Sequence, residues 1–191
     1  MKRTALIIVD IQNDYFPGGR FEQEGATAAA KNAARAIGFF RERGLPLIHI
    51  RHESLGPAAG FFIPGTEGAK IHPSVAPVAG ETVILKHYPN SFLGTALEET
   101  LRSMGVERVV LAGMMTLMCI DATARAAVDL GFAVTVLHDA CAARKLMFGQ
   151  ITVPAAHVHA AFLAALAMVY AEVTDTASFV GRLPANTETA P

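Results

Sequence analysis

The chain has 191 residues, of which 52% are hydrophobic and 17% are charged. This composition is typical of a globular protein, and the length predicts one domain with a sizeable core. The formal net charge is −1, so the charge gives no reason to expect a nucleic-acid partner. The two cysteines, Cys119 and Cys141, form neither a CxxC nor a zinc-finger pattern. Such sparse cysteines favour a reducing, cytoplasmic location over a disulfide framework.

The N-terminal apolar run is short. Lys2 and Arg3 precede residues 5–9 in the manner of a signal peptide, but Asp10 ends the run after five residues. A signal peptide needs about 7–15 apolar residues. The longest apolar helical stretch, 160–171, is also too short for a bilayer, which takes about 20 residues. We therefore expect no targeting segment and no membrane partner.

Apolar runs alternate with helical patterns along the chain. Strands are predicted over 5–9, 47–50, 82–85, 108–113, 132–137 and 172–174. Helices are predicted over 26–43, from a capping box at Thr95 to Met104, after Cys119, over 154–170, and at the C-terminal end. This alternation indicates a mostly parallel sheet that is covered on both faces. We expect a single domain over residues 1–183 and a tail over 184–191.

Two connecting segments show little periodicity. Residues 53–77 are rich in Gly, Pro and aromatic residues, and so long a loop is usually a binding loop or lid. The sequence leaves open whether it is a lid or a subunit contact. Residues 142–152 are predicted to be a plain connecting loop.

The stretch 108–125 contains the main candidate for chemistry. An apolar strand leads through Gly113 to Cys119, and apolar residues then recur at helical spacing. Cys119 is therefore expected at a strand-to-helix turn, where free N–H groups and the helix dipole favour a thiolate nucleophile. The alternative is a buried structural cysteine, since free Cys is among the most buried residue types.

Asp10 and Lys86 follow two other predicted strands. Sites in open parallel sheets lie outside the carboxyl ends of the strands, so both residues should reach the same edge as Cys119. Each has an ordinary alternative, because Asp often caps a turn and Lys often ends a strand in solvent. Three chemically suitable residues at one edge are stronger support for a site than any one of them.

In their local contexts, Asp10, Lys86 and Cys119 resemble the isochorismatase-like cysteine hydrolase family. The matching stretches are 7–14 (IIVDIQND), 85–92 (LKHYPNSF) and 113–125 (GMMTLMCIDATAR), and the resemblance covers about residues 4–180. The family includes nicotinamidases, N-carbamoylsarcosine amidohydrolases, ureidoacrylate amidohydrolases and isochorismatases. The resemblance implies a three-layer α/β/α sandwich around a six-stranded, mostly parallel sheet, and a homodimer or homotetramer.

The resemblance also implies a catalytic triad of Asp10, Lys86 and Cys119 that cleaves a C–N bond of a small amide, ureido or cyclic-amide substrate. Cys119 would form a thioester, Asp10 would move the proton, and Lys86 would pair with Asp10. The backbone N–H groups of Met115 and Cys119 would form the oxyanion hole, next to a cis Met114–Met115 bond.

Three departures from the family pattern bear on the substrate. Relatives often have His two residues before the nucleophile, where this chain has Leu117. Nicotinamidases carry a metal site of one Asp and two His after the second strand, whereas this chain has His49 and His52 without an Asp. These two His should face opposite sides of a strand, so we expect no metal and no other cofactor. Isochorismatases proper lack the nucleophilic Cys, so Cys119 favours amide-type hydrolysis.

Candidate substrate contacts lie on the loops beyond the strand ends: Phe16, His52, Tyr88 and Phe92. His138 and Asp139 lie at a strand end and could also approach the site.

One rival is a non-catalytic binding or assembly protein on the same fold. A nucleotide-dependent enzyme is disfavoured, because no strand leads into GxGxxG or a Walker A motif. A thiol redox protein would need Cys141 to reach Cys119. The sequence does not identify the substrate.

Overall fold

The computed structural model describes residues 3–182. Six strands form one parallel sheet in the order β3-β2-β1-β4-β5-β8. Their bounds are β1 Thr4–Val9, β2 Leu47–His52, β3 Thr82–Lys86, β4 Arg108–Met114, β5 Ala133–Ala142 and β8 Glu172–Thr174. The predicted six-stranded sheet is confirmed. The predicted tail, 184–191, lies outside the described residues.

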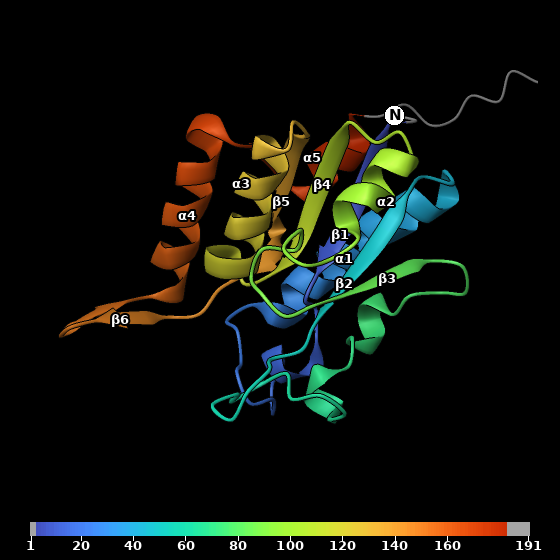
Figure 1. Cartoon of the computed structure of the whole chain (residues 1–191). Coiled ribbons are helices and arrows are strands. Elements are labelled where there is room, and N and C mark those ends of the chain that lie inside the picture. The colour runs from blue at the N-terminus through green and yellow to red at the C-terminus, as the bar shows by residue number, and fades with distance from the viewer. Residues whose placement is uncertain (1–2, 183–191) are drawn as a thin grey trace, which may run out of the picture.

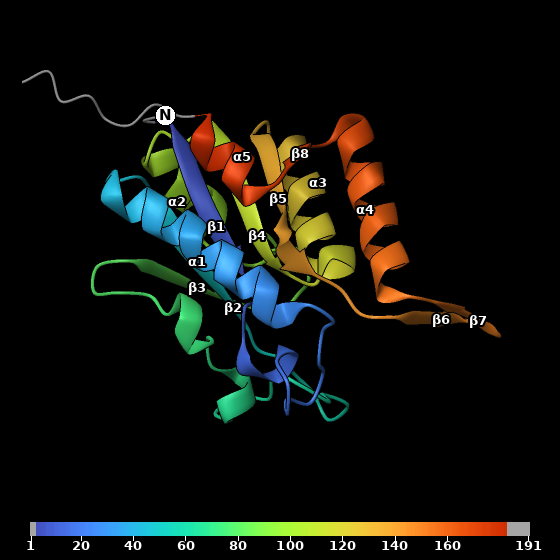
Figure 2. The same cartoon turned by 180° about the vertical axis from the view of Figure 1, so that it is seen from behind.

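Helices cover both faces of the sheet, as Figures 1 and 2 show. One face carries α1 (Ala26–Glu42) and α5 (Thr176–Gly181), and the other carries α2 (Leu97–Ser103), α3 (Asp121–Asp129) and α4 (Ala155–Val169). In β1, Leu6 and Ile8 belong to the core under α1, whereas Ile7 belongs to the core under α2 and α3. Burial on both faces explains why the central strand is continuously apolar. Among the described helices, none is both long and apolar enough to cross a membrane.

The strand β5 extends beyond its predicted end and contains an irregularity. Leu111 of β4 pairs with Val136, but Gly113, two residues later, pairs with Cys141. The additional residues of β5 include Asp139, whose Oδ1 accepts hydrogen bonds from the N–H and hydroxyl of Thr176 at 2.8 and 2.7 Å. Asp139 thus anchors the start of α5.

The prediction of a plain loop over 142–152 is wrong. The segment contains most of an antiparallel hairpin of β6 (Leu146–Phe148) and β7 (Ile151–Val153). Figures 1 and 2 show that this hairpin projects from the body of the molecule beyond α4. Each strand has only three residues, too few for an alternating pattern to appear in the sequence.

The predicted capping box at Thr95 is also absent from the described structure. The N-cap of α2 is Ala96, which has no capping side chain. The Thr95 hydroxyl accepts a hydrogen bond from Leu97 N–H at 3.2 Å and donates one to Ser91 O at 2.6 Å. Glu98 accepts a hydrogen bond from Arg102 at 2.8 Å. Thr95 therefore ties the start of α2 to the preceding loop.

Candidate active site

The structure brings Asp10, Lys86 and Cys119 together at the carboxyl edge of the sheet. Asp10 follows β1, Lys86 ends β3, and Cys119 lies in the first helical turn after β4. Lys86 Nζ is 2.8 Å from Asp10 Oδ2. A carboxylate oxygen of Asp10, Cys119 Sγ and a ring nitrogen of His52 all lie within 4.8 Å of one another. The exposed fractions of Asp10, Lys86 and Cys119 are 0%, 1% and 2%, so all three side chains are buried.

Asp10 occupies an unusual backbone conformation. Its φ is +52°, in the left-handed region that L-residues rarely adopt and that Asp tolerates better than most. Its N–H donates to Ile50 O at 3.1 Å, and its carbonyl accepts from Gln12 N–H at 2.9 Å. Two neighbouring segments therefore hold the chain in this conformation just where it leaves β1.

Cys119 lies within a π-helical turn, Thr116–Ile120, that continues into α3. Such turns are rare and are frequent at functional sites. The carbonyl of Met115, the N-cap residue, accepts hydrogen bonds from the N–H groups of Met118 and Ile120 at 3.1 and 3.2 Å. The peptide bond between Met114 and Met115 is cis.

The Thr116 hydroxyl links this turn to two neighbouring elements. It donates to Ala142 O in β5 at 3.1 Å and lies 2.9 Å from His159 Nδ1 in α4. Because the single hydroxyl proton goes to Ala142, the His159 Nδ1–H is the donor in the second contact. The position of the Cys119 turn is thus tied to both β5 and α4.

The ion pair is charged in the folded protein. Burial opposes the charge of Asp10, but the Lys86 ammonium and the nearby His52 hold the pKa of this carboxyl below its ordinary value. Burial also opposes the charge of Lys86, but the Asp10 carboxylate keeps the pKa of Lys86 above its ordinary value. The two directions agree, and each charge stabilises the other.

The strand-to-helix position of Cys119 predicts a thiolate, and this prediction is wrong for the resting site. Burial, followed by the negative charge of Asp10, raises the pKa of the Cys119 thiol well above its ordinary value, although Lys86 acts in the opposite direction. The sequence argument counted the helix dipole but not the complete burial of the side chain. Cys119 is therefore a neutral thiol beside a carboxylate that can take its proton.

His52, at the end of β2, is the fourth side chain of the cluster. Its Nδ1 is 3.7 Å from Asp10 Oδ2. The side chain of Gln12 holds the His52 backbone from both sides, because Nε2 donates to His52 O at 2.8 Å and Oε1 accepts from His52 N–H at 2.7 Å. His49 faces the other side of β2, as predicted, where its Nε2 is 2.9 Å from Glu81. Gln12 was not predicted, since a single buried Gln in a loop leaves no periodic pattern.

The loop 53–77 packs against the loop that follows β1. Asp14 is buried, and its carboxylate accepts hydrogen bonds from Phe62 N–H at 2.7 Å and Arg20 N–H at 3.2 Å. The backbone of Gly68 approaches so closely that a Cβ there would lie 2.1 Å from Asp14 Oδ1. Gln12 Nε2 also donates to Ala69 O at 2.8 Å. Contacts within its own chain therefore fix this loop beside the site.

Of the four candidate substrate contacts, His52 reaches the cluster. The Phe16 ring is buried and stacks on His72 with centroids 3.7 Å apart. Phe92 stacks on Phe132 with centroids 6.1 Å apart, near the amino end of β5. Tyr88 is 55% exposed. None of these contacts puts Phe16, Tyr88 or Phe92 against the three clustered side chains.

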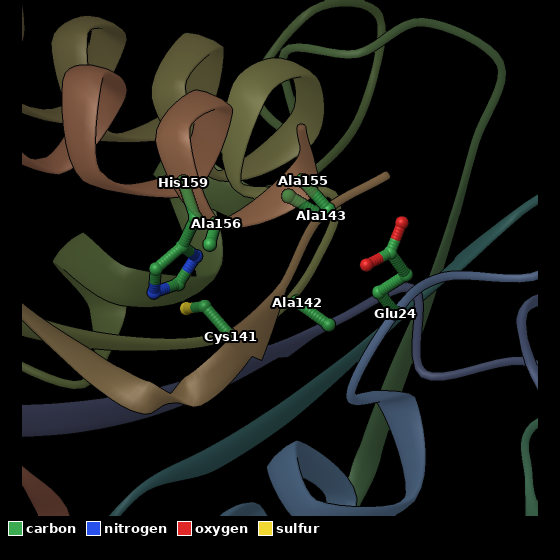
Figure 3. Close-up of a pocket in the computed structure, with 7 residues that line it drawn as sticks. All are labelled: Glu24, Cys141, Ala142, Ala143, Ala155, Ala156 and His159. Carbon is green, nitrogen blue, oxygen red and sulfur yellow. The ribbon is translucent and has the colours of Figure 1, made fainter. Parts of the chain in front are cut away.

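A separate cavity of about 250 Å³ lies between the end of β5 and the start of α4. In Figure 3, Cys141 and His159 lie together at one end of the cavity and Glu24 at the other. Burial raises the pKa of the Cys141 thiol to about 12. The lining residues are Glu24, Cys141, Ala142, Ala143, Ala155, Ala156 and His159.

A six-stranded parallel sheet between helices, with its polar cluster at the carboxyl edge, is the architecture of an α/β protein whose site lies beyond the ends of its strands. Residues 4–178 match the family model for the Isochorismatase domain. The chain therefore belongs to the isochorismatase family, whose members are hydrolases.

Similar proteins cover between 72% and 94% of the chain. The isochorismatase family protein YddQ of Bacillus subtilis is 50% identical over 177 residues, which are 93% of this chain and 98% of that protein. A crystal structure of a protein from Oleispira antarctica has a TM-score of 0.91 at 49% identity, covering 94% of this chain and 97% of its own. The maleamate amidohydrolase of Pseudomonas putida is 32% identical over 152 residues, with 72% of this chain and 71% of that protein covered.

Proposed function

We propose that the protein is a cysteine-dependent hydrolase that cleaves the C–N bond of a small amide, ureido or cyclic-amide substrate. The observation that carries this proposal is the buried Asp10–Lys86 ion pair beside the Cys119 thiol. Burying two charges costs several kcal/mol per ion, a cost that a purely structural pair rarely recovers. Similarity to an enzyme named maleamate amidohydrolase supports the amide class.

The first half of the reaction forms a thioester. Cys119 Sγ attacks the acyl carbon while its proton passes to Asp10, and the carbonyl oxygen becomes an oxyanion. The backbone N–H groups of Met115 and Cys119 stabilise this oxyanion. The C–N bond then breaks as Asp10 returns the proton to the leaving nitrogen. Transfer from a neutral thiol avoids an isolated thiolate in the buried site.

The second half hydrolyses the thioester. Asp10 takes a proton from water, the resulting hydroxide attacks the acyl carbon, and the C–S bond breaks. Cys119 regains its proton and a carboxylic acid leaves. Lys86 stays charged throughout and is positioned by a hydrogen bond to Pro89 O at 2.8 Å. Water, substrate and these side chains account for every proton and electron pair, so we propose no cofactor.

The cellular compartment that we propose is inferred from the free thiols of the two cysteines. Cys119 and Cys141 are both free, and a free nucleophilic thiol persists best in a reducing compartment. We therefore assign the reaction to the cytoplasm.

The alternative is a non-catalytic binding or assembly protein on the same fold. The raised pKa of the Cys119 thiol favours it, because a neutral buried thiol is a poor nucleophile without a base. Reactivity of Cys119 that depends on Asp10 separates the two.

The direct test is a screen for release of ammonia or amine from small carboxamides, ureido acids and cyclic amides, with maleamate included. We expect turnover by the wild-type protein and by Cys141→Ala, and none by Cys119→Ala. Turnover that survives in Cys119→Ala would exclude Cys119 as the nucleophile. No turnover of any of these substrates by the wild-type protein would favour the alternative.

A further inference from the structure

Three side chains at the carboxyl edge offer ligand atoms of the kinds that zinc binds. Cys119 Sγ, a ring nitrogen of His52 and a carboxylate oxygen of Asp10 are all within 4.8 Å of one another, and all three residues are buried. Thiolate, imidazole and carboxylate are the usual protein ligands of zinc. Among residues 3–182, no other three such side chains come this close.

Two of these side chains have buried polar atoms without a hydrogen-bond partner among the described residues. His52 is 8% exposed, and within residues 3–182 its Nδ1 has no hydrogen-bond partner. Neither oxygen of the fully buried Asp10 accepts a hydrogen bond of ordinary geometry from the described residues, although Lys86 pairs with Oδ2. An unsatisfied buried polar atom costs about 1–3 kcal/mol, so a ligand that binds both groups is favoured.

The separations are close to those of a tetrahedral site. Zinc binds nitrogen and oxygen at about 2.0–2.1 Å and sulfur at about 2.3 Å, which places neighbouring ligand atoms about 3.3–3.6 Å apart. His52 Nδ1 and Asp10 Oδ2 are already 3.7 Å apart. Sγ of Cys119 needs to approach by at most about 1.5 Å, given the upper limit of 4.8 Å, and a change of side-chain rotamer supplies such a movement.

The backbone of each ligand residue is held in place. The Gln12 side chain hydrogen-bonds both the carbonyl and the N–H of His52. Asp10 and Cys119 follow the two adjacent central strands, β1 and β4. A site whose backbone is fixed loses little conformational entropy when an ion binds.

We propose that Asp10, His52 and Cys119 form an inhibitory zinc site that masks the nucleophile. On binding, the Zn–S bond forms as the S–H bond breaks, and the thiol proton passes to solvent. Water fills the fourth position. The neighbouring Lys86 charge opposes the ion, so binding is reversible rather than structural. The inhibitory role rests on the proposed function, whereas zinc binding does not, because zinc contacts the resting side chains.

The test is titration of Zn²⁺ into the metal-free protein against a chromophoric chelator, with peptide mapping of alkylated thiols. We expect one zinc per chain and protection of Cys119, but not Cys141, from alkylation. Cys119→Ser and His52→Phe should each weaken binding by at least tenfold. If His52→Phe melts well below the wild type, His52→Gln replaces it. Cys141→Ser and His157→Phe change the same residue types elsewhere and should bind as the wild type does.

Three results would overturn the proposal. One is that a folded Cys119→Ser, His52→Phe or His52→Gln variant binds zinc with the affinity of the wild-type protein. Another is zinc protection of Cys141 in place of Cys119, which would move the site to the cavity beside His159. The third is absence of binding in a tenfold excess of zinc. None of these readouts requires a substrate, so failure here is distinguishable from failure of the hydrolase proposal.

Discussion

At the scale of single residues, Asp10 combines the features on which the site depends. It is fully buried, has a left-handed backbone conformation and pairs with Lys86 beside the Cys119 thiol. A buried pair is costly to break but much less costly to replace as a whole. This difference separates the catalytic role of the pair from its effect on stability.

Single substitutions in the pair should destabilise the protein, and the double substitution should restore much of the loss. Asp10→Asn or Lys86→Met leaves one buried charge unpaired, at a cost of about 3–5 kcal/mol in the free energy of unfolding. Both variants should also lose about 10²–10⁴ in turnover, because Asp10→Asn removes the base and Lys86→Met removes the charge that lowers the pKa of Asp10. The combination should recover stability but not turnover. Urea denaturation measures the first effect and amine release the second. A double variant less stable than either single variant would contradict this account.

At the scale of elements, the close packing of β1 against β4 fixes the distance between Asp10 and the Cys119 turn. Gly113 pairs with Val9 in neighbouring strands, and a Cβ at 113 would lie 1.9 Å from Val9 O. Residues with a side chain also rarely adopt its φ of +142°. Glycine is needed here for a close approach of two backbones rather than for a turn.

Gly113→Ala should therefore prevent folding or cost more than about 3 kcal/mol in the free energy of unfolding. Gly105→Ala is the matched control, because its φ of +65° is strained but its Cβ would meet nothing within 4 Å. We expect about 1–2 kcal/mol there. Equal losses in the two variants, measured by urea denaturation, would show that contact with Val9 is unimportant.

A second network joins α1, β2 and the turn before β3. The Arg41 guanidinium bonds both oxygens of Glu81 at 2.7 and 2.9 Å, and His49 and Val78 N–H also contact this carboxylate. The hydrogen bonds from Arg41, followed by those from Val78 and His49, lower the pKa of Glu81 to about 2 against the opposing effect of burial. Its charge therefore stabilises the folded protein.

The contribution of Glu81 should depend on pH. Because the pKa is lowered on folding, the stabilisation is complete above about pH 4.5 and is lost as the pH falls towards 2. Glu81→Gln should reduce the free energy of unfolding by roughly 1–3 kcal/mol at pH 7, after allowance for partial exposure. The difference from the wild type should shrink below pH 4. A difference that is constant from pH 7 to 3 would refute the assigned pKa.

At the scale of the whole molecule, the most unusual surface is the projecting hairpin and the neighbouring helix α4. Met147 and Phe148 are 75% and 85% exposed, and Met168 and Val169 at the end of α4 are 83% and 78% exposed. Residues 155–169 contain no Asp, Glu, Lys or Arg. Exposed apolar surface of this kind commonly mediates association, which fits the expected homodimer or homotetramer.

Charges on the hairpin should therefore change the oligomeric state. The wild-type protein is expected to sediment as a dimer or tetramer, and Met147→Glu with Phe148→Glu should shift it towards monomer. Leu55→Glu is the control, since Leu55 is 63% exposed but lies on another loop. Analytical ultracentrifugation measures the shift. A wild-type monomer, or a hairpin variant that remains associated, would contradict the prediction.

The sequence predicts the sheet and the cluster because both depend on patterns that can be recognised in the linear sequence. Continuous apolar runs identify buried parallel strands, and the residues after them share one edge, which brings Asp10 and Lys86 to Cys119. The hairpin was missed because strands of three residues show no period. Burial of Cys119, and hence its raised pKa, depends on segments far away in sequence. The hydrogen bond from the Gln12 side chain to the His52 backbone joins residues 40 apart in the sequence, so no local sequence pattern predicts it.

The measurement that tests the central claim most directly is the rate at which iodoacetamide alkylates each cysteine near neutral pH, with chelator present and by peptide mapping. If Asp10 accepts the thiol proton, Cys119 should react faster than Cys141, and Asp10→Asn should lower the ratio of the Cys119 rate to the Cys141 rate at least tenfold. Cys141 is a suitable internal reference, because it is buried and burial raises the pKa of its thiol to about 12. A Cys119 that is as inert as Cys141 and insensitive to Asp10→Asn would contradict the assignment of Cys119 as an activated nucleophile.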